Sequence, residues 1–229
     1  MIDQPQYPER VTFRTAELLS TSWQGFSRNF AVLFFSYLLF SLINGSIGPF
    51  LVGPLWYGLC LQSLNAARGE LVTFEQFFAG FNKFLPTFAM GLLMSAACLA
   101  GFLVLIVPTC VLAYLVFDPY NRFPFILITS CGGAATLLPT VGVVLFYGPA
   151  VLFMHEYNLG MWDALEASRA MVWRNLKQWC ELWAAITLLH LAGLLLCCVG
   201  AFFTTPWMIV GLAEGFRREQ AALQAAKPV

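Results

Sequence analysis

Long apolar runs separated by short polar segments dominate this sequence. A helix that crosses the hydrocarbon core of a bilayer needs about 20 apolar residues. The first run, residues 30–64, is too long for one crossing, and the turn signal Asn44–Pro49 divides it near 30–45 and 49–67. The later runs lie at residues 86–117, 123–154, 179–200 and 204–217. The pattern therefore predicts an all-helical integral membrane protein with six transmembrane helices.

The third and fourth runs are longer than one straight crossing requires, and each contains a proline, Pro108 and Pro139. Proline removes a backbone donor and clashes with the preceding turn, so we predict a kink in each helix at these positions. A broken or re-entrant helix is the alternative at either place, because neighbouring helices can satisfy the freed carbonyls.

Three polar, amphipathic segments precede the three predicted hairpins, at residues 12–30, 73–88 and 161–179. The closest match is between Arg28-Asn29-Phe30 and Arg174-Asn175-Leu176. An α-helix in the second segment would place Phe74, Phe77, Phe78 and Phe81 on one face. Such segments are typical of helices that lie in the membrane interface. The pattern suggests three pseudo-repeats, residues 12–67, 73–156 and 160–218, within a single membrane domain; convergent interface chemistry is the alternative.

The composition supports a membrane protein. Hydrophobic residues make up 59% of the chain and charged residues 10%, whereas soluble domains carry roughly 25% charged residues. The net charge is zero, which gives no field to attract nucleic acid. Of the 12 basic residues, only Arg122 falls in the predicted outer loops. Because basic residues are retained in the cytoplasm, we predict that both termini are cytoplasmic.

Motifs for catalysis and metal binding are not found in the sequence. It contains no HExxH, P-loop, GxSxG or dinucleotide fingerprint. The seven cysteines form no CxxC pair and lie in or beside apolar runs, so we interpret them as small apolar residues. Two histidines are too few for a typical multi-histidine metal site. We therefore expect no metal, no cofactor and no enzymatic activity.

Four short motifs resemble a group of uncharacterised bacterial membrane proteins. They are Gly53-Pro54-Leu55-Trp56-Tyr57-Gly58-Leu59, Phe77-Phe78-Ala79-Gly80-Phe81, Leu137-Leu138-Pro139-Thr140-Val141-Gly142 and Asp163-Ala164-Leu165-Glu166-Ala167-Ser168-Arg169. This group is similar to the membrane domain attached to some glycerophosphodiester phosphodiesterases. The resemblance covers about residues 50–215, without a phosphodiesterase domain and with Thr140 where glycine would be expected. It implies a multi-helix bundle of the bacterial inner membrane and no established catalytic residues.

Ionisable residues within or beside the predicted spans are the candidate site residues, because a charge placed there is costly. His190, midway along the fifth run, is a weak candidate for cofactor binding; a hydrogen bond to a neighbouring helix is the alternative. Other candidates mark cytoplasmic ends of spans and could surround a lipid phosphate or a substrate path, or simply pair with one another in the headgroup region. These are His155, Glu156, Arg169, Arg174, Glu181, Glu214 and Arg217.

Three functions remain open from the sequence. The first is a non-enzymatic accessory or scaffold subunit, whose partners are membrane lipids and either other membrane subunits or further copies of this chain. The second is a transporter or channel for a lipid or small amphiphile. A mid-membrane cavity would favour it if lined by Asn44, Thr136, Thr140, Thr187 or His190. The third is a membrane enzyme or cofactor carrier that uses His190, or His155 with Glu156.

Overall fold

All regular structure in the described parts of the chain is helical. The computed structural model describes residues 14–47, 49–115, 137–195 and 199–225. Its elements are α1 (Thr15–Arg28), α2 (Phe30–Ile47), η1 (Pro49–Leu51), α3 (Val52–Ala67), η2 (Phe74–Lys83), α4 (Phe84–Leu115), α6 (Leu137–Tyr147), α7 (Ala150–Glu156), α8 (Met161–Arg174), α9 (Leu176–Leu195) and α10 (Val199–Ala225). Here η1 and η2 are 3₁₀ helices. The predicted all-helical fold is thus confirmed for these residues.

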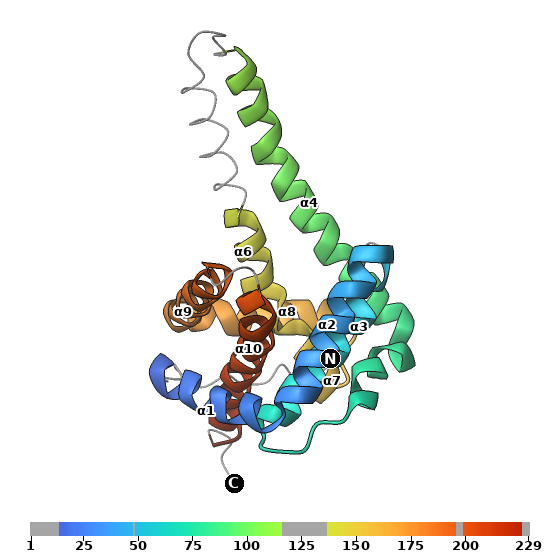
Figure 1. Ribbon diagram of the computed structural model, residues 1–229, viewed down its shortest axis with the longest axis vertical. Coiled ribbons are helices and arrows are strands. Elements are labelled where there is room, and N and C mark those ends of the chain that lie inside the picture. The colour runs from blue at the N-terminus through green and yellow to red at the C-terminus, as the bar shows by residue number, and fades with distance from the viewer. Residues whose placement is uncertain (1–13, 48, 116–136, 196–198, 226–229) are drawn as a thin grey trace.

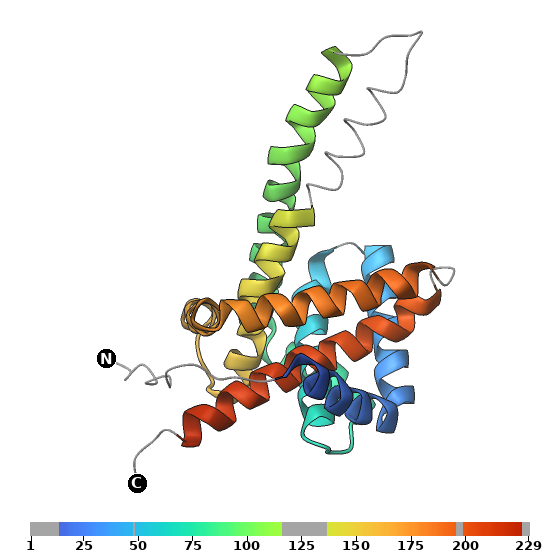
Figure 2. The same cartoon turned by 90° about the vertical axis from the view of Figure 1, so that its left-hand side faces the viewer.

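The helices form a packed body from which one long helix projects. Figure 1 shows α4 rising out of the body, with α6 beside its lower part. In Figure 2, α2 and α3 run roughly along the direction of α4, whereas α9 and α10 run crosswise to it. The same view looks down the axis of α8, which crosses beside the lower parts of α4 and α6.

Helix α3 forms the centre of the body. Twelve of its sixteen residues are buried, because α1, α2, η2, α4, α7 and α10 all pack against it. Glycines allow two of these close approaches: a side-chain carbon at Gly53 would clash with the Thr87 carbonyl of α4, and one at Gly58 with the Phe77 carbonyl of η2. Small residues let helix backbones meet in this way, as they do in membrane helix bundles.

Length and composition identify few of these helices as candidate membrane spans. The continuous helical segment Phe74–Leu115 is long and apolar enough to cross a bilayer, and only 11% of its most apolar stretch is buried. The pair α1 and α2, bent by 88° at its break, passes the same test when taken together. Within the described residues, the structure therefore supports one or two candidate spans, which is a weak indication of membrane association.

The predicted helix boundaries are confirmed in part. Helices α2 and α3 divide the first apolar run close to Asn44–Pro49, as predicted. Helix α4 continues through Pro108 without a break, so the broken alternative is wrong there. In the fourth run the described interruption falls at Gly148-Pro149, between α6 and α7. Pro139 lies in the first turn of the described part of α6. The residues that precede α6 are outside the described ranges, so the predicted kink at Pro139 stays a prediction.

The three amphipathic segments fold as α1, η2 and α8, each directly before a longer helix. The predicted α-helical face in the second segment is wrong, because η2 is a 3₁₀ helix with three residues per turn. Only Phe77 of its predicted face is buried, together with Gly80 three residues later. A side-chain carbon at Gly80 would clash with the Pro54 carbonyl, so α3 approaches this face too closely for further phenylalanine rings.

Candidate functional site

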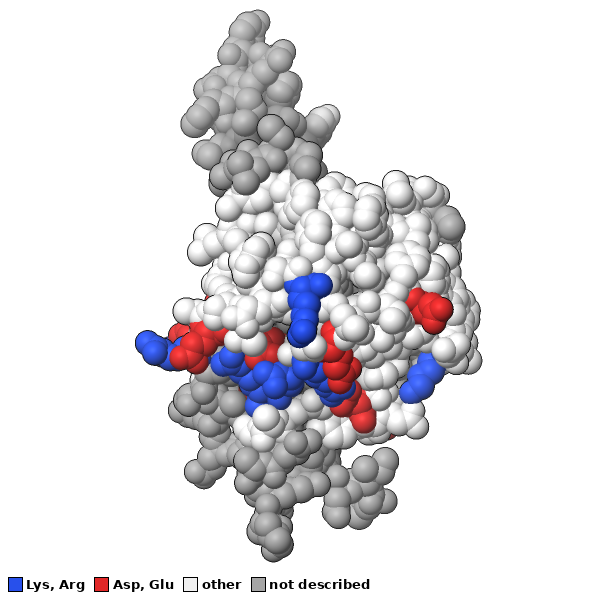
Figure 3. Space-filling view, turned by 60° about the horizontal axis from the view of Figure 1, so that its bottom comes forward, with Lys and Arg blue, Asp and Glu red and all other residues white. Residues whose placement is uncertain are grey.

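Charged side chains gather on one face of the molecule. Figure 3 shows Lys, Arg, Asp and Glu in a band across the underside, while the surface above it carries almost none. Three polar contacts link different parts of the chain: Arg68 with Glu156, Arg218 with Glu17, and Lys83 with Asn158. The molecule is therefore polarised, with one charged face and a body whose remaining visible surface is apolar or uncharged.

A buried carboxylate joins two arginines in the second half of α10. The Glu214 side chain is fully buried. Arg217 donates to both of its oxygens, at 2.7 and 2.8 Å, and Arg218 Nε donates to Oε1 at 2.9 Å. Arg218 also donates to Thr21 Oγ1 of α1, at 3.3 Å. These charge-assisted bonds hold Glu214, one of the predicted site residues, and fix α1 on α10.

His155 and Glu156 belong to a second cluster between α3 and α7. Arg68 Nη2 donates to Glu156 Oε2 at 2.7 Å, and the Tyr57 hydroxyl lies 3.0 Å from His155 Nδ1. Burial lowers the pKa of His155, and the nearby Glu156 charge opposes that shift. A largely neutral imidazole suits a hydrogen-bonded partner of Tyr57 near neutral pH.

The other predicted site residues lie in separate contacts. Arg169 is 3.9 Å from Glu166 on α8, and Glu181 is 3.9 Å from Lys177 on α9, all at exposed positions. Arg174 acts on Glu219 of α10 through its charge. The structure thus distributes the seven cytoplasmic candidates over several pairs, and any role of these residues in lipid or partner contact stays a prediction.

The Arg-Asn-apolar matches mark two helix corners. At the corner between α1 and α2, Asn29 Nδ2 donates to the carbonyls of Gly25 and Glu70, and its Oδ1 accepts from the Val72 N–H. At the corner between α8 and α9, Asn175 Nδ2 donates to Glu219 Oε1 at 2.7 Å. Both asparagines are 6% exposed. Each one uses its side-chain amide to secure the break before a long helix.

We expect Glu219 to make stability depend on pH. Its carboxyl is 3% exposed, and burial raises its pKa from 4.5 to about 7, against the opposing bond from Asn175. Because the folded state holds this proton more tightly, the contribution of Glu219 to stability is greatest below about pH 4.5 and falls by about 3 kcal/mol as pH rises through 7. Glu219→Gln should therefore unfold at a higher temperature than the parent at pH 8 and at a similar temperature near pH 4.5.

Thermal unfolding in detergent at several pH values measures this difference. Glu181→Gln, a change at an exposed carboxylate, is the matched control and should leave the pH profile unchanged. A Glu219→Gln protein whose unfolding temperature follows the same pH profile as the parent would contradict the assignment.

His190 lies on α9, with its side chain against α10. Its Nδ1 is 3.4 Å from both the Thr204 and the Thr205 hydroxyl oxygens. These contacts agree with the alternative to cofactor binding that the sequence left open, a hydrogen bond between His190 and a neighbouring helix. Within the described ranges, no three His, Cys, Asp or Glu side chains gather closely enough to hold a metal ion.

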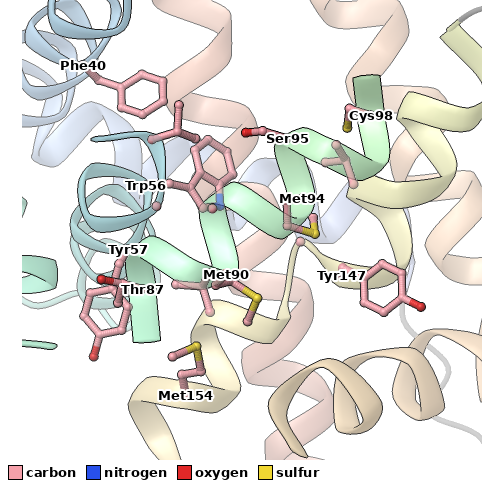
Figure 4. Close-up of a pocket in the computed structure, with 16 residues that line it drawn as sticks. Phe40, Trp56, Tyr57, Thr87, Met90, Met94, Ser95, Cys98, Tyr147 and Met154 are labelled. Carbon is pink, nitrogen blue, oxygen red and sulfur yellow. The ribbon is translucent and has the colours of Figure 1, made fainter. Parts of the chain in front are cut away.

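An apolar cavity of about 320 Å³ lies between α3, α4 and the α6–α7 segment. Figure 4 shows rings from Phe40, Trp56 and Tyr57 on one side, and the sulfur-bearing side chains of Met90 and Met154 toward its lower end. The lining differs from the predicted one. Neither Asn44, Thr187 nor His190 lines this cavity; Thr136 and the side chain of Thr140 lie outside the described residues.

Several contacts were not predicted from the sequence. Arg68 and Tyr57 complete the cluster at His155, and Arg218 completes the one at Glu214. The repeated Arg-Asn pair was a usable signal for the two corners, but nothing in the sequence pointed from Asn175 to Glu219.

No family model, curated protein or solved structure matches this chain. The resemblance to uncharacterised bacterial membrane proteins therefore stays a prediction. Any function must be argued from the chain's own geometry.

Proposed function

We propose that this chain is a non-enzymatic integral membrane protein that acts as an accessory or scaffold subunit of a membrane assembly. The uncovered apolar surface of α4 supports this proposal most directly. Along its outer half, Val104, Tyr114 and Leu115 are 69%, 78% and 73% exposed. Apolar surface of this extent marks contact with lipid or with another protein.

The proposal includes six transmembrane passes in a bacterial inner membrane, with both termini in the cytoplasm. The charged underside supports it, because basic side chains of membrane proteins are held on the cytoplasmic side. Amphipathic helices such as α1 and α8 would then lie at headgroup depth. The crosswise α9–α10 hairpin is the part that most needs a test, since a pass through the bilayer requires it to be strongly inclined.

Reporter fusions at Gly45, Asn121 and Thr204 measure the topology. All three should report the far compartment, and a fusion at Gly69, in the turn after α3, should report the cytosol. A cytosolic reporter at Thr204 alone would reduce the topology to four passes. Release of the whole protein from membranes by alkaline carbonate would show that it is not an integral membrane protein.

The scaffold role predicts protein contacts at α4 within the bilayer. A photo-crosslinking amino acid at Val104 should give discrete protein adducts in native membranes, either with a second copy or with one other subunit. The matched control is Leu71, which is 79% exposed in the turn beyond α3 and should give background only. Lipid adducts alone at Val104 would contradict the scaffold role while leaving membrane insertion intact.

The cavity between α3 and α4 favours a second candidate, a carrier of a lipid or small amphiphile. Its volume of about 320 Å³ and largely apolar lining suit one apolar chain or ring system. Binding of a fluorescent fatty acid to the parent protein, and its loss in the Ser95→Trp variant, would support this role. Equal binding by the parent and Ser95→Trp proteins would exclude this cavity as the carrier site.

A further inference from the structure

Two adjoining hollows lie where α8 crosses beside the lower parts of α4 and α6. Their volumes are about 510 and 640 Å³, and both are lined by Val143, Tyr147 and Arg169. Leu93, Met94 and Ala97 of α4 line the first hollow, and Phe146 of α6 lines the second. Beyond this crossing, α4 continues away from α8, and it carries exposed apolar side chains such as Leu99 and Val104.

Tryptophans on α8 flank these hollows. Trp162 lines the first and Trp173 the second, and each side chain is 68% exposed. Exposed tryptophan is characteristic of headgroup depth, where one part of the ring meets hydrocarbon and the other meets water. Helix α8 thus has the expected position for the boundary between acyl chains and headgroups.

Both signs of charge occur at the rim. Arg169 and Glu166 lie three residues apart on α8, with Nη2 and Oε1 separated by 3.9 Å. This distance is longer than a hydrogen bond, so the guanidinium and carboxylate can both still bind a ligand. Their side chains are 60% and 62% exposed. A matching ligand carries an anionic group and a cationic N–H donor close together, joined to apolar chains.

We propose that these hollows bind a zwitterionic phospholipid whose headgroup ends in a primary ammonium, an inference that rests on the proposed membrane location. Arg169 binds the phosphate as a charged donor, and Glu166 accepts from the ammonium. The acyl chains occupy the two hollows on either side of Tyr147. Two other classes of phospholipid fit less well. A headgroup with a quaternary ammonium offers no N–H donor to Glu166, and an anionic headgroup without an amine places only negative charge beside the Glu166 carboxylate.

Native mass spectrometry of protein taken from vesicles tests the assignment. The vesicles contain equal parts of phosphatidylethanolamine, phosphatidylglycerol and phosphatidylcholine, and the retained lipids are counted. We expect phosphatidylethanolamine to be retained at least five-fold over the other two. Arg169→Ala should lower total retention several-fold, whereas Glu166→Gln should mainly remove the preference for the primary ammonium.

Matched variants separate this site from general charge effects. Arg14 and Glu17 on α1 form a pair with the same spacing and the same 3.9 Å separation, so Arg14→Ala and Glu17→Gln should retain lipid as the parent does. Val143 lines both hollows, so Val143→Trp narrows both of them and should reduce retention without any change of charge. Its failure to do so would overturn the acyl-chain placement.

Equal retention of the three lipids by the parent protein would overturn the headgroup assignment. The assignment would also be overturned if Arg14→Ala and Arg169→Ala reduced lipid retention equally. It would likewise be overturned if a protein, including a second copy of this chain, occupied the hollows in place of lipid. In each of these cases carbonate-resistant membrane insertion would leave the proposed function standing. Loss of insertion itself would instead show that the proposed function is wrong.

Discussion

Replacing Glu214 with alanine is expected to lower the free energy of unfolding by about 3–5 kcal/mol. The carboxylate is fully buried and accepts three hydrogen bonds from Arg217 and Arg218. Without it, two guanidinium groups remain close together with no opposing charge between them. The contact from Arg218 to Thr21 should weaken as well, so α1 would loosen from α10.

Thermal unfolding in detergent measures this loss, which should appear as a fall of roughly 6–20 °C in the unfolding temperature of a chain of this size. Glu17→Ala is the matched control, because Glu17 is 60% exposed and lies 3.9 Å from Arg218; it should change stability by less than about 0.5 kcal/mol. Glu214→Gln keeps an acceptor but loses the charge, and should fall between the two. If the Glu214→Ala protein unfolded at the same temperature as the Glu17→Ala control, the Glu214 cluster would contribute little to stability.

The helical segments were predictable because their signals are local. A long apolar run interrupted by a turn signal at Asn44–Pro49 predicts the division into α2 and α3 without knowledge of their neighbours. The breaks before α2 and α9 were equally local, since Asn29 and Asn175 each follow an arginine at the end of a short amphipathic helix.

Packing determined what the sequence could not. The phenylalanines of η2 fit an α-helical face in isolation, but close contact with the backbone of α3 at Gly58 and Pro54 accompanies a 3₁₀ turn. The crosswise direction of α9 and α10 likewise depends on contacts with α1 and α3, which leave no periodic signature. The interruption at Gly148-Pro149 was the exception, because proline after glycine is a local signal that the interpretation overlooked.

The sequence predicted which charged residues belong to candidate sites, but not which of them contact each other. Arg68 and Glu156 are 88 positions apart, and Asn175 and Glu219 are 44 apart. Which of these groups meet depends on the order in which helices pack around α3. Sequence reasoning therefore identified charged residues at the ends of the apolar runs and left open whether they surround one ligand or pair with one another. In the structure they form separate pairs, and the partners that lie far apart in the chain could not be identified from the sequence.

Substitution of Gly91 with leucine is expected to separate α3 from α4 and to lower the free energy of unfolding by about 3 kcal/mol or more. A side-chain carbon at Gly91 would clash with the backbone of Gly53, and one at Gly53 would clash with the Thr87 carbonyl. These are backbone atoms of two helices, so neither rotamer changes nor the movement of a flexible side chain can relieve the overlap. The helices themselves must move apart.

Gly45→Leu is the control for this change, because no atom lies within 4 Å of a side-chain carbon added at Gly45 near the end of α2. Leucine also has a higher helix propensity than glycine, so the control should be neutral or slightly stabilising. Thermal unfolding in detergent compares the two proteins directly. Equal stability would mean that α3 and α4 do not meet through their glycines, and the cavity bounded by Gly53, Gly91 and Trp56 would then lose its geometric basis.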